Sequence, residues 1–195
     1  MTARLISVIG PPASGKTTLA ELLAEDMPAE LLREDYEGNP FLADSYAGPE
    51  EARLPAQLFY LLSRVRQLSR ATWPDEGLLV SDYGFCQDRL YATQRLAADE
   101  LTAYDSVHAH LARRVHRPDV LVHLDARPAT LLERIARRGR AFERAMTRAF
   151  LEDMRAAYDE VVASASCPVV RVDGETVDVR RPDERAKIIE EIRRL

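Results

Sequence analysis

Short apolar runs alternate with longer helical patterns along most of this chain. The clearest runs cover residues 5–9, 78–80, 120–124 and 169–172, and a weaker one covers residues 30–33. They are rich in Val, Ile and Leu without polar alternation, which is typical of parallel strands buried on both faces. We therefore predict five short parallel strands.

Helical periodicity fills the segments between these runs. We expect helices over residues 16–27, 49–72, 85–115 in two pieces, 128–138 and 141–165, and a last one beginning at Pro182. Pro55 is expected to kink the second helix. Such alternation predicts an α/β fold, a doubly wound five-stranded parallel sheet flanked by helices, with ligands at the carboxyl ends of the strands.

Domain organisation follows from what the pattern lacks. The sequence shows no internal repeat, no low-complexity stretch and no linker rich in Gly or Ser, so we expect a single domain over residues 1–195. Gly139 interrupts an arginine-rich segment between two helical patterns, which is typical of a mobile flap.

Charge and cysteine content narrow the class of protein. A net charge of −5 argues against a protein that binds nucleic acid through phosphate attraction. Cys86 and Cys167 lack the spacing of a metal site and are expected to be free thiols, and the four histidines show no ligand spacing either. Because no apolar run reaches the roughly 20 residues of a membrane span, and no signal peptide precedes the first strand, we expect a cytoplasmic protein without a membrane partner.

The most specific motif lies between the first strand and the first helix. Its eight residues match the pattern G-x-x-x-x-G-K-[ST]: Gly10, Pro11, Pro12, Ala13, Ser14, Gly15, Lys16 and Thr17. Glycines allow backbone N–H groups to turn toward phosphates, and the helix N-terminus adds partial positive charge. In this interpretation Lys16 contacts the β and γ phosphates of ATP, and Thr17 is a ligand of Mg²⁺.

A phosphate loop alone does not decide between a small-molecule kinase, a GTPase switch and a mechanical ATPase. The chain has no Asn-Lys-x-Asp segment, and Asp82-Tyr83-Gly84-Phe85 lacks the spacing of a GTPase switch. At 195 residues it also has no room for the partner-facing modules of a motor. These observations favour a kinase.

Four further segments follow the loop in a characteristic order. The first is Glu34-Asp35-Tyr36-Glu37-Gly38-Asn39-Pro40-Phe41-Leu42 with Tyr46, and the second is Gln57-Leu58-Phe59-Tyr60-Leu61-Leu62-Ser63-Arg64. The third is Leu79-Val80-Ser81-Asp82-Tyr83, and the fourth runs from Pro118 to Leu124 and continues as an arginine-rich stretch from Leu132 to Glu143. Together with the loop they cover about residues 5–173 and resemble the deoxynucleoside kinase family.

The resemblance implies a role for each segment. Glu34 matches the base that removes the proton from the 5′-hydroxyl, with Glu37 as the alternative, and Asp82 matches a carboxylate associated with Mg²⁺. The remaining matches are a nucleoside pocket, a pair on the sugar 3′-hydroxyl and an arginine lid over about residues 134–143. Their residues are Gln57, Arg64 and Tyr91 for the pocket, Tyr46 and Glu143 for the hydroxyl, and Arg134, Arg138 and Arg140 for the lid.

Two positions depart from the family pattern. Asp35 stands where a proline commonly follows the glutamate, and Tyr83 stands where the acid-Arg-Ser motif has its arginine. A Ser-Asp-Tyr in this place is similar to bacterial members of the family. We expect an arginine of the lid, or Arg89, to replace the missing positive charge.

The resemblance thus implies an ATP- and Mg²⁺-dependent kinase that phosphorylates a deoxynucleoside, with purines favoured, and that forms a homodimer packed through helices. Two other functions stay open at this point. One is a kinase of nucleoside monophosphates or of another small metabolite, which would need further phosphate-binding arginines in the acceptor pocket. The other is a non-catalytic nucleotide-dependent switch, which would need no acceptor pocket.

Overall fold

A single parallel sheet forms the centre of the protein. The computed structural model describes residues 2–195, and Met1 of the expected 1–195 domain lies outside them. The strands are β1 (Arg4–Ile9), β2 (Glu30–Leu32), β3 (Leu78–Ser81), β4 (Val120–Asp125) and β5 (Val169–Asp173), in the order β2-β3-β1-β4-β5. Every pairing is parallel, which confirms the predicted five-stranded sheet.

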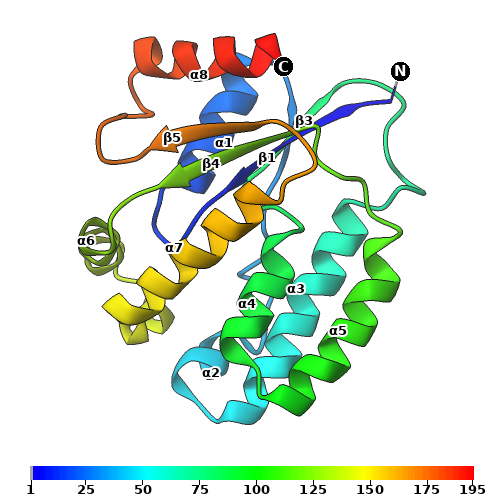
Figure 1. The fold of residues 1–195 in the computed structure, drawn as a ribbon, viewed down its shortest axis with the longest axis vertical. Helices are drawn as coiled ribbons and strands as arrows, with labels where there is room; N and C mark the ends of the chain where they lie inside the picture. Colours follow the sequence, from blue (N-terminus) through cyan, green and yellow to red (C-terminus); the bar gives the residue numbers. More distant parts are fainter. Residues whose placement is uncertain (1) are drawn as a thin grey trace.

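Helices cover both faces of this sheet (Figure 1). They are α1 (Lys16–Asp26), α2 (Leu42–Ala47), α3 (Arg53–Gln67), α4 (Gln87–Arg95), α5 (Ala98–Ala112), α6 (Pro128–Arg138), α7 (Arg148–Ala163) and α8 (Pro182–Arg194), with 3₁₀ turns η1 (Glu50–Ala52) and η2 (Ala141–Ala145). Figure 1 shows α3, α4 and α5 side by side in one layer, away from α8. The doubly wound arrangement is therefore confirmed.

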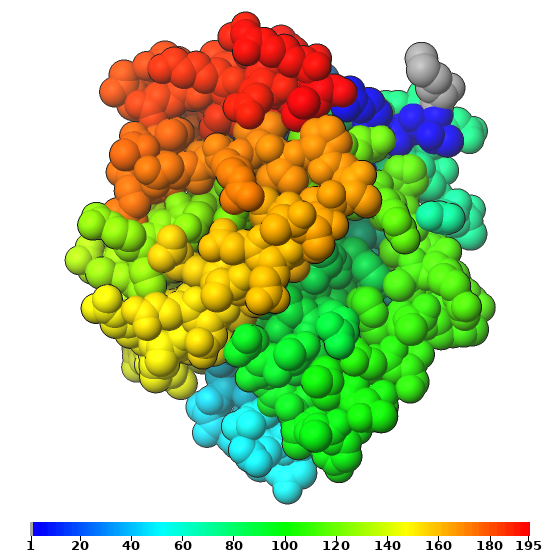
Figure 2. All heavy atoms as spheres, in the orientation of Figure 1, coloured from blue at the N-terminus to red at the C-terminus, as the bar shows by residue number. Residues whose placement is uncertain are grey.

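The core has two sides that meet at the central strands. On one side, Leu19 and Leu23 of α1 and Ile188 of α8 share a buried cluster with strand residues such as Val8. On the other side, Met154 and Tyr158 of α7 pack with Ile9 and Leu121. Because a parallel strand in this position is buried on both faces, β1 and β4 are almost continuously apolar, as the sequence pattern indicated. In the space-filling view, α8 caps one end of the molecule, and α2, α4 and α5 lie toward the other (Figure 2).

The structure differs from the predicted helices in three segments. Pro55 lies in the first turn of α3, where proline needs no N–H partner, so it begins a helix where we expected a kink, and α3 ends at Gln67. The helix expected over residues 141–165 is split, because η2 ends at Ala145 and α7 begins after its cap, Thr147, whose side chain accepts from the Phe150 N–H. The short helix α2 was not predicted.

Several predicted site residues lie at the carboxyl ends of the strands. The phosphate loop follows β1, Asp82 directly follows β3, and the segment with Glu34 follows β2. In the described part of the chain, no helix is long and apolar enough to span a membrane. Cys86 and Cys167 are free thiols, as expected.

Candidate active site

The phosphate loop is shaped by backbone that only particular residues can adopt. Gly10 has φ 149°, and a Cβ at this position would lie 2.1 Å from the carbonyl oxygen of Leu124 in β4. Gly15 has φ 109° and precedes the first turn of α1, and Ala13 has φ 61°. These left-handed positions turn successive N–H groups toward one side of the loop, and the N-terminus of α1 adds positive potential there.

Lys16 extends from this loop over its own backbone. Its Nζ donates to the carbonyl oxygen of Pro11 at 3.0 Å, and its side chain lines a pocket together with Glu34 and Asp82. Burial lowers the pKa of Lys16 to about 8, and the neighbouring carboxylates of Glu34 and Asp82 act in the opposite direction. A phosphate group bound here would favour the charged lysine.

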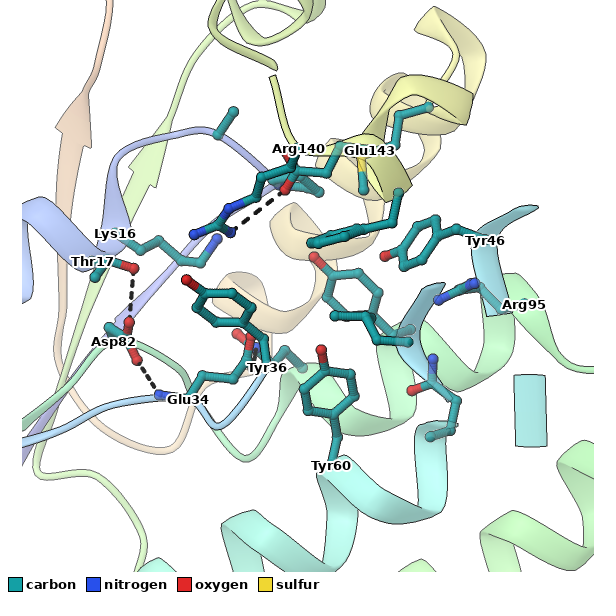
Figure 3. A pocket seen from close by; sticks show the side chains of 18 of the residues that line it. Lys16, Thr17, Glu34, Tyr36, Tyr46, Tyr60, Asp82, Arg95, Arg140 and Glu143 are labelled. Carbon is teal, nitrogen blue, oxygen red and sulfur yellow. Dashed lines mark hydrogen bonds and ion pairs between the residues drawn. The ribbon is translucent and has the colours of Figure 1, made fainter. Parts of the chain in front are cut away.

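Thr17 and Asp82, the two predicted magnesium ligands, are in direct contact. The Thr17 hydroxyl donates to Asp82 Oδ2 at 2.7 Å, and the Glu34 backbone N–H donates to Asp82 Oδ1 at 2.7 Å (Figure 3). Within residues 2–195 no group of three or more His, Cys, Asp or Glu side chains could hold a metal by itself. A hydroxyl and one carboxylate nevertheless fit Mg²⁺, which keeps several waters and takes its other ligands from substrate phosphates.

Glu34 is held at one of its two carboxylate oxygens. Its Oε1 accepts a hydrogen bond from Gln87 Nε2 at 3.0 Å and forms an ion pair with the Arg64 guanidinium. The Glu34 side chain is 26% exposed and lines the pocket. Because both interactions end on Oε1, Oε2 is available to accept a proton from a bound hydroxyl.

Arg64 places a positive charge beside Glu34, whereas we expect a lid arginine or Arg89 to replace the family arginine at the position of Tyr83. Its guanidinium is buried between the carboxylates of Glu34 and Asp88. Arg89 instead pairs with Asp105 on the surface, so that half of the prediction was wrong. Tyr83, which stands in place of the family arginine, lies with its ring 5.5 Å from the Arg64 guanidinium carbon.

The walls of the acceptor pocket come from segments far apart in the chain. Among the predicted site residues, Tyr46, Gln57, Arg64, Tyr91 and Glu143 all line it, together with Tyr36, Tyr60, Arg95 and Phe142. Figure 3 shows Tyr36, Tyr46 and Tyr60 around the same space. Gln57 is only 2% exposed, which makes it a fixed polar group in an aromatic wall.

Arg138 and Arg140 of the lid line the same pocket as Lys16 and Thr17 of the phosphate loop. Both oxygens of the buried Glu143 carboxylate accept from Arg138, and the Arg138 Nε bond measures 2.9 Å. Arg140 Nη1 lies 3.8 Å from the same carboxylate. Glu143 therefore holds the Arg138 side chain more firmly than the Arg140 side chain.

Arg134, the third predicted lid arginine, faces a different space. It donates to the backbone oxygens of Ser14 at 3.1 Å and Gly174 at 2.7 Å. It lines an open groove of about 610 Å³ formed by the phosphate loop, Arg137, Arg138 and the segment 174–180. Arg137, which the family resemblance does not assign to the lid, also lines this groove. The groove and the acceptor pocket share Ala13 and Arg138, so the two spaces adjoin at the phosphate loop.

Sequence reasoning missed several residues of the site. Asp88 is fully buried, and burial raises the pKa of its carboxyl to about 6, while Arg64 acts in the opposite direction. Gln87, Tyr36 and Arg95 also belong to the site, and the Arg95 guanidinium carbon lies 3.8 Å from the Tyr46 ring centroid. The acidic residue in the first turn of α4, close after Asp82, was the available signal for Asp88.

The chain is similar to known proteins in sequence and in fold over most of its length. The chain is 29% identical over 187 residues to a deoxyguanosine kinase of Bacillus subtilis, a match covering 91% of this chain and 89% of the relative. It is 30% identical over 192 residues to a deoxyadenosine kinase of Dictyostelium discoideum, covering 94% and 77% of the two chains. The structure of deoxyadenosine kinase from M. mycoides with dCMP and dCDP bound superposes with a TM-score of 0.83 at 21% identity, covering 98% of this chain and 100% of that one.

The family itself is identified over nearly the whole sequence. A model of the deoxynucleoside kinase family matches residues 6–195. That match includes the phosphate loop, Glu34, Asp82 and the lid, all of which meet around one pocket. The chain belongs to the deoxynucleoside kinase family.

Proposed function

We propose that this enzyme transfers the γ-phosphoryl group of ATP to the 5′-hydroxyl of a deoxynucleoside, with purines preferred. The observation that carries the proposal is the position of Glu34. The Glu34 carboxylate lines one pocket together with Lys16 of the phosphate loop and with Gln57 and Tyr46 of the expected nucleoside site. A base placed between a phosphate loop and a pocket lined by polar and aromatic side chains is what transfer to a sugar hydroxyl requires.

In this mechanism Glu34 Oε2 accepts the 5′-hydroxyl proton as the oxygen forms its bond to the γ-phosphorus. The bond between that phosphorus and the β–γ bridging oxygen breaks, and ADP leaves. Lys16, Arg138 and Arg140 stabilise the charge on the transferring group, and the lid excludes water that would otherwise hydrolyse ATP. Thr17 and Asp82 would hold Mg²⁺, which would neutralise negative charge on the phosphates.

The open groove beside Arg134 is the proposed site of the adenosine part of ATP. It is continuous with Ser14 and Gly15 of the phosphate loop and is walled by Arg134 and Arg137. Arginine planes stack on aromatic rings, which suits a purine base. The groove shares Ala13 and Arg138 with the acceptor pocket, which supports donor and acceptor meeting at the phosphate loop.

Base selection is proposed to involve Arg64, Asp88 and Gln57. Arg64 Nε and Asp88 Oδ2 are buried atoms without a hydrogen-bond partner in residues 2–195, one a donor and the other an acceptor. Adenine would satisfy both, because its N7 accepts and its 6-amino group donates, whereas guanine has acceptors at both N7 and O6, so this pair favours adenine among the purines. The names of the relatives from B. subtilis and D. discoideum support the purine preference.

We include a homodimer in this proposal. Leu62 of α3 and Val107 of α5 are 56% and 41% exposed, and both lie in the helical layer at one end of the molecule. A second copy packed through these helices would cover them. Light scattering coupled to size-exclusion chromatography decides between a monomer and a dimer.

A substrate panel tests the function. Four deoxynucleosides and their four 5′-monophosphates are incubated with ATP labelled at the γ-phosphate, and the products are separated. We expect label in deoxynucleoside 5′-monophosphates, most strongly for deoxyguanosine or deoxyadenosine. If labelled deoxynucleoside diphosphates formed from the monophosphates, and no labelled monophosphate formed from the deoxynucleosides, the protein would be a monophosphate kinase. ATP turnover without any labelled acceptor nucleotide would favour a switch.

A further inference from the structure

Tyr36 and Arg140 join two segments that face each other across the pocket. Tyr36 follows Glu34 by two residues in the segment between β2 and α2, and Arg140 belongs to the lid. The Arg140 guanidinium carbon lies 4.2 Å from the centroid of the Tyr36 ring. Both side chains line the pocket near Lys16 (Figure 3). This distance is that of a cation–π contact.

The Tyr36 ring is oriented by its own segment. Its hydroxyl donates to Glu37 Oε1 at 3.0 Å, and its backbone N–H donates to the Glu34 carbonyl oxygen at 3.0 Å. Asp35 Oδ1 accepts from the Gly38 N–H at 2.9 Å, and a Cβ on Gly38 would lie 2.5 Å from that oxygen. This turn therefore presents the ring to the lid without help from the lid itself.

Arg140 has weaker support inside the lid than Arg138 has. Arg138 forms two hydrogen bonds with Glu143, whereas Arg140 reaches the same carboxylate only at 3.8 Å. The Arg140 side chain is 32% exposed, so water competes for it. Contact with the Tyr36 ring is consequently the short-range interaction that ties Arg140 to the far side of the pocket.

We propose that Tyr36 is a positioning residue that holds Arg140 over the phosphate loop in the closed lid. It thereby couples the segment bearing the base to the arginine that meets the transferring phosphoryl group. This inference rests on the proposed function for its effect on turnover, but the contact itself can be tested without turnover. Its consequence is that an aromatic ring, and not the hydroxyl, is required at position 36.

Turnover is measured first. Tyr36→Leu should lower kcat about three- to tenfold, in line with a partly exposed cation–π contact, while Tyr36→Phe keeps the ring and should stay within about twofold of the parent. In an Arg140→Ala background, Tyr36→Leu should cause no additional loss, because the partner is already absent. Phe41→Leu removes a 42% exposed aromatic ring from the same region and serves as the matched control.

Trypsin cleavage supplies the readout that is independent of activity. Cleavage after Arg140, followed by mass spectrometry and normalised to cleavage after the exposed Arg70, which lies between α3 and β3 at the amino end of the strand, should be faster in Tyr36→Leu and unchanged in Tyr36→Phe. Equal cleavage in Tyr36→Leu and the parent would overturn the proposal, as would a full kcat loss that persists in the Arg140→Ala background. If no deoxynucleoside is phosphorylated, the proposed function fails while the cleavage comparison still decides the contact.

Discussion

The phosphate loop and the acceptor pocket meet at Lys16 and Glu34 but are built differently. The loop is one continuous segment whose shape comes from left-handed backbone at Gly10, Ala13 and Gly15. The pocket is assembled from side chains between Glu34 and Glu143 and depends on buried ion pairs. We therefore expect changes in the loop to affect transfer to every acceptor, and changes in the pocket to affect particular substrates.

This difference predicts that damage to the loop abolishes transfer to every acceptor. Lys16→Ala should reduce kcat by on the order of 10³-fold or more for all deoxynucleosides, because the charge on the γ-phosphate loses its main partner. Lys187→Ala, at an exposed position of α8, is the matched control and should leave kcat unchanged. Near-normal turnover of Lys16→Ala at saturating ATP would remove the loop from the mechanism.

Glu34, at the junction of the two regions, should give the next largest effect. Glu34→Gln should lower kcat by about 10²- to 10⁴-fold, the usual worth of a general base, with little change in ATP binding. Glu37→Gln should do far less, because Glu37 is exposed and its carboxylate accepts from the Tyr36 hydroxyl. Steady-state kinetics and nucleotide titration of both variants provide the measurement, and a larger kcat loss for Glu37→Gln would show that the base is misassigned.

Variants of Tyr46 and Glu143 test the pocket half of this comparison. Their loss of kcat/KM should depend on whether the sugar carries a 3′-hydroxyl. Tyr46→Phe should reduce kcat/KM for deoxynucleosides by up to about tenfold, and much less for 2′,3′-dideoxynucleosides, because only the former offer a 3′-hydroxyl. Glu143→Gln should show the same selectivity on top of a general loss, as it also loosens Arg138. Equal losses of kcat/KM for both sugar types in Tyr46→Phe would exclude this residue from the sugar site.

Gln57 should give the smallest and most selective effect. Gln57→Leu keeps the buried volume but removes a side-chain amide, so kcat/KM should fall by roughly two- to tenfold for the preferred base, and the ranking of the four bases should narrow. Turnover of ATP at saturating acceptor should change little. An unchanged ranking of the four deoxynucleosides would place base selection elsewhere in the pocket.

Prediction from sequence succeeded where the signal was local. The five strands, the phosphate loop and the start of α8 at Pro182 were all visible as patterns over a few residues. It failed at α2, which spans only Leu42–Ala47 and is too short to show a helical period. It also failed at Pro55, because proline in a first helical turn and proline within a helix look alike until the helix start is known.

The roles of the arginines show the same limit. The sequence could place Arg138 and Arg140 in a lid, but not separate them from Arg134, which contacts Ser14 and Gly174. It could also report that Tyr83 replaces an arginine, but not that Arg64 supplies charge to Glu34. Each of these outcomes depends on which remote segment lies within a few ångströms of a long side chain.

By itself, the sequence determined the backbone of this site: the strand, the phosphate loop and the helix that follows, with Asp82 and Glu34 after neighbouring strands. Those features arise from dihedral preferences and from burial patterns, which act over adjacent residues. Only the tertiary structure decided that Arg64 lies between Glu34 and Asp88, and that Arg140 lies on Tyr36. Ion pairs and cation–π contacts act over a few ångströms, and the packing of helices against the sheet sets those distances.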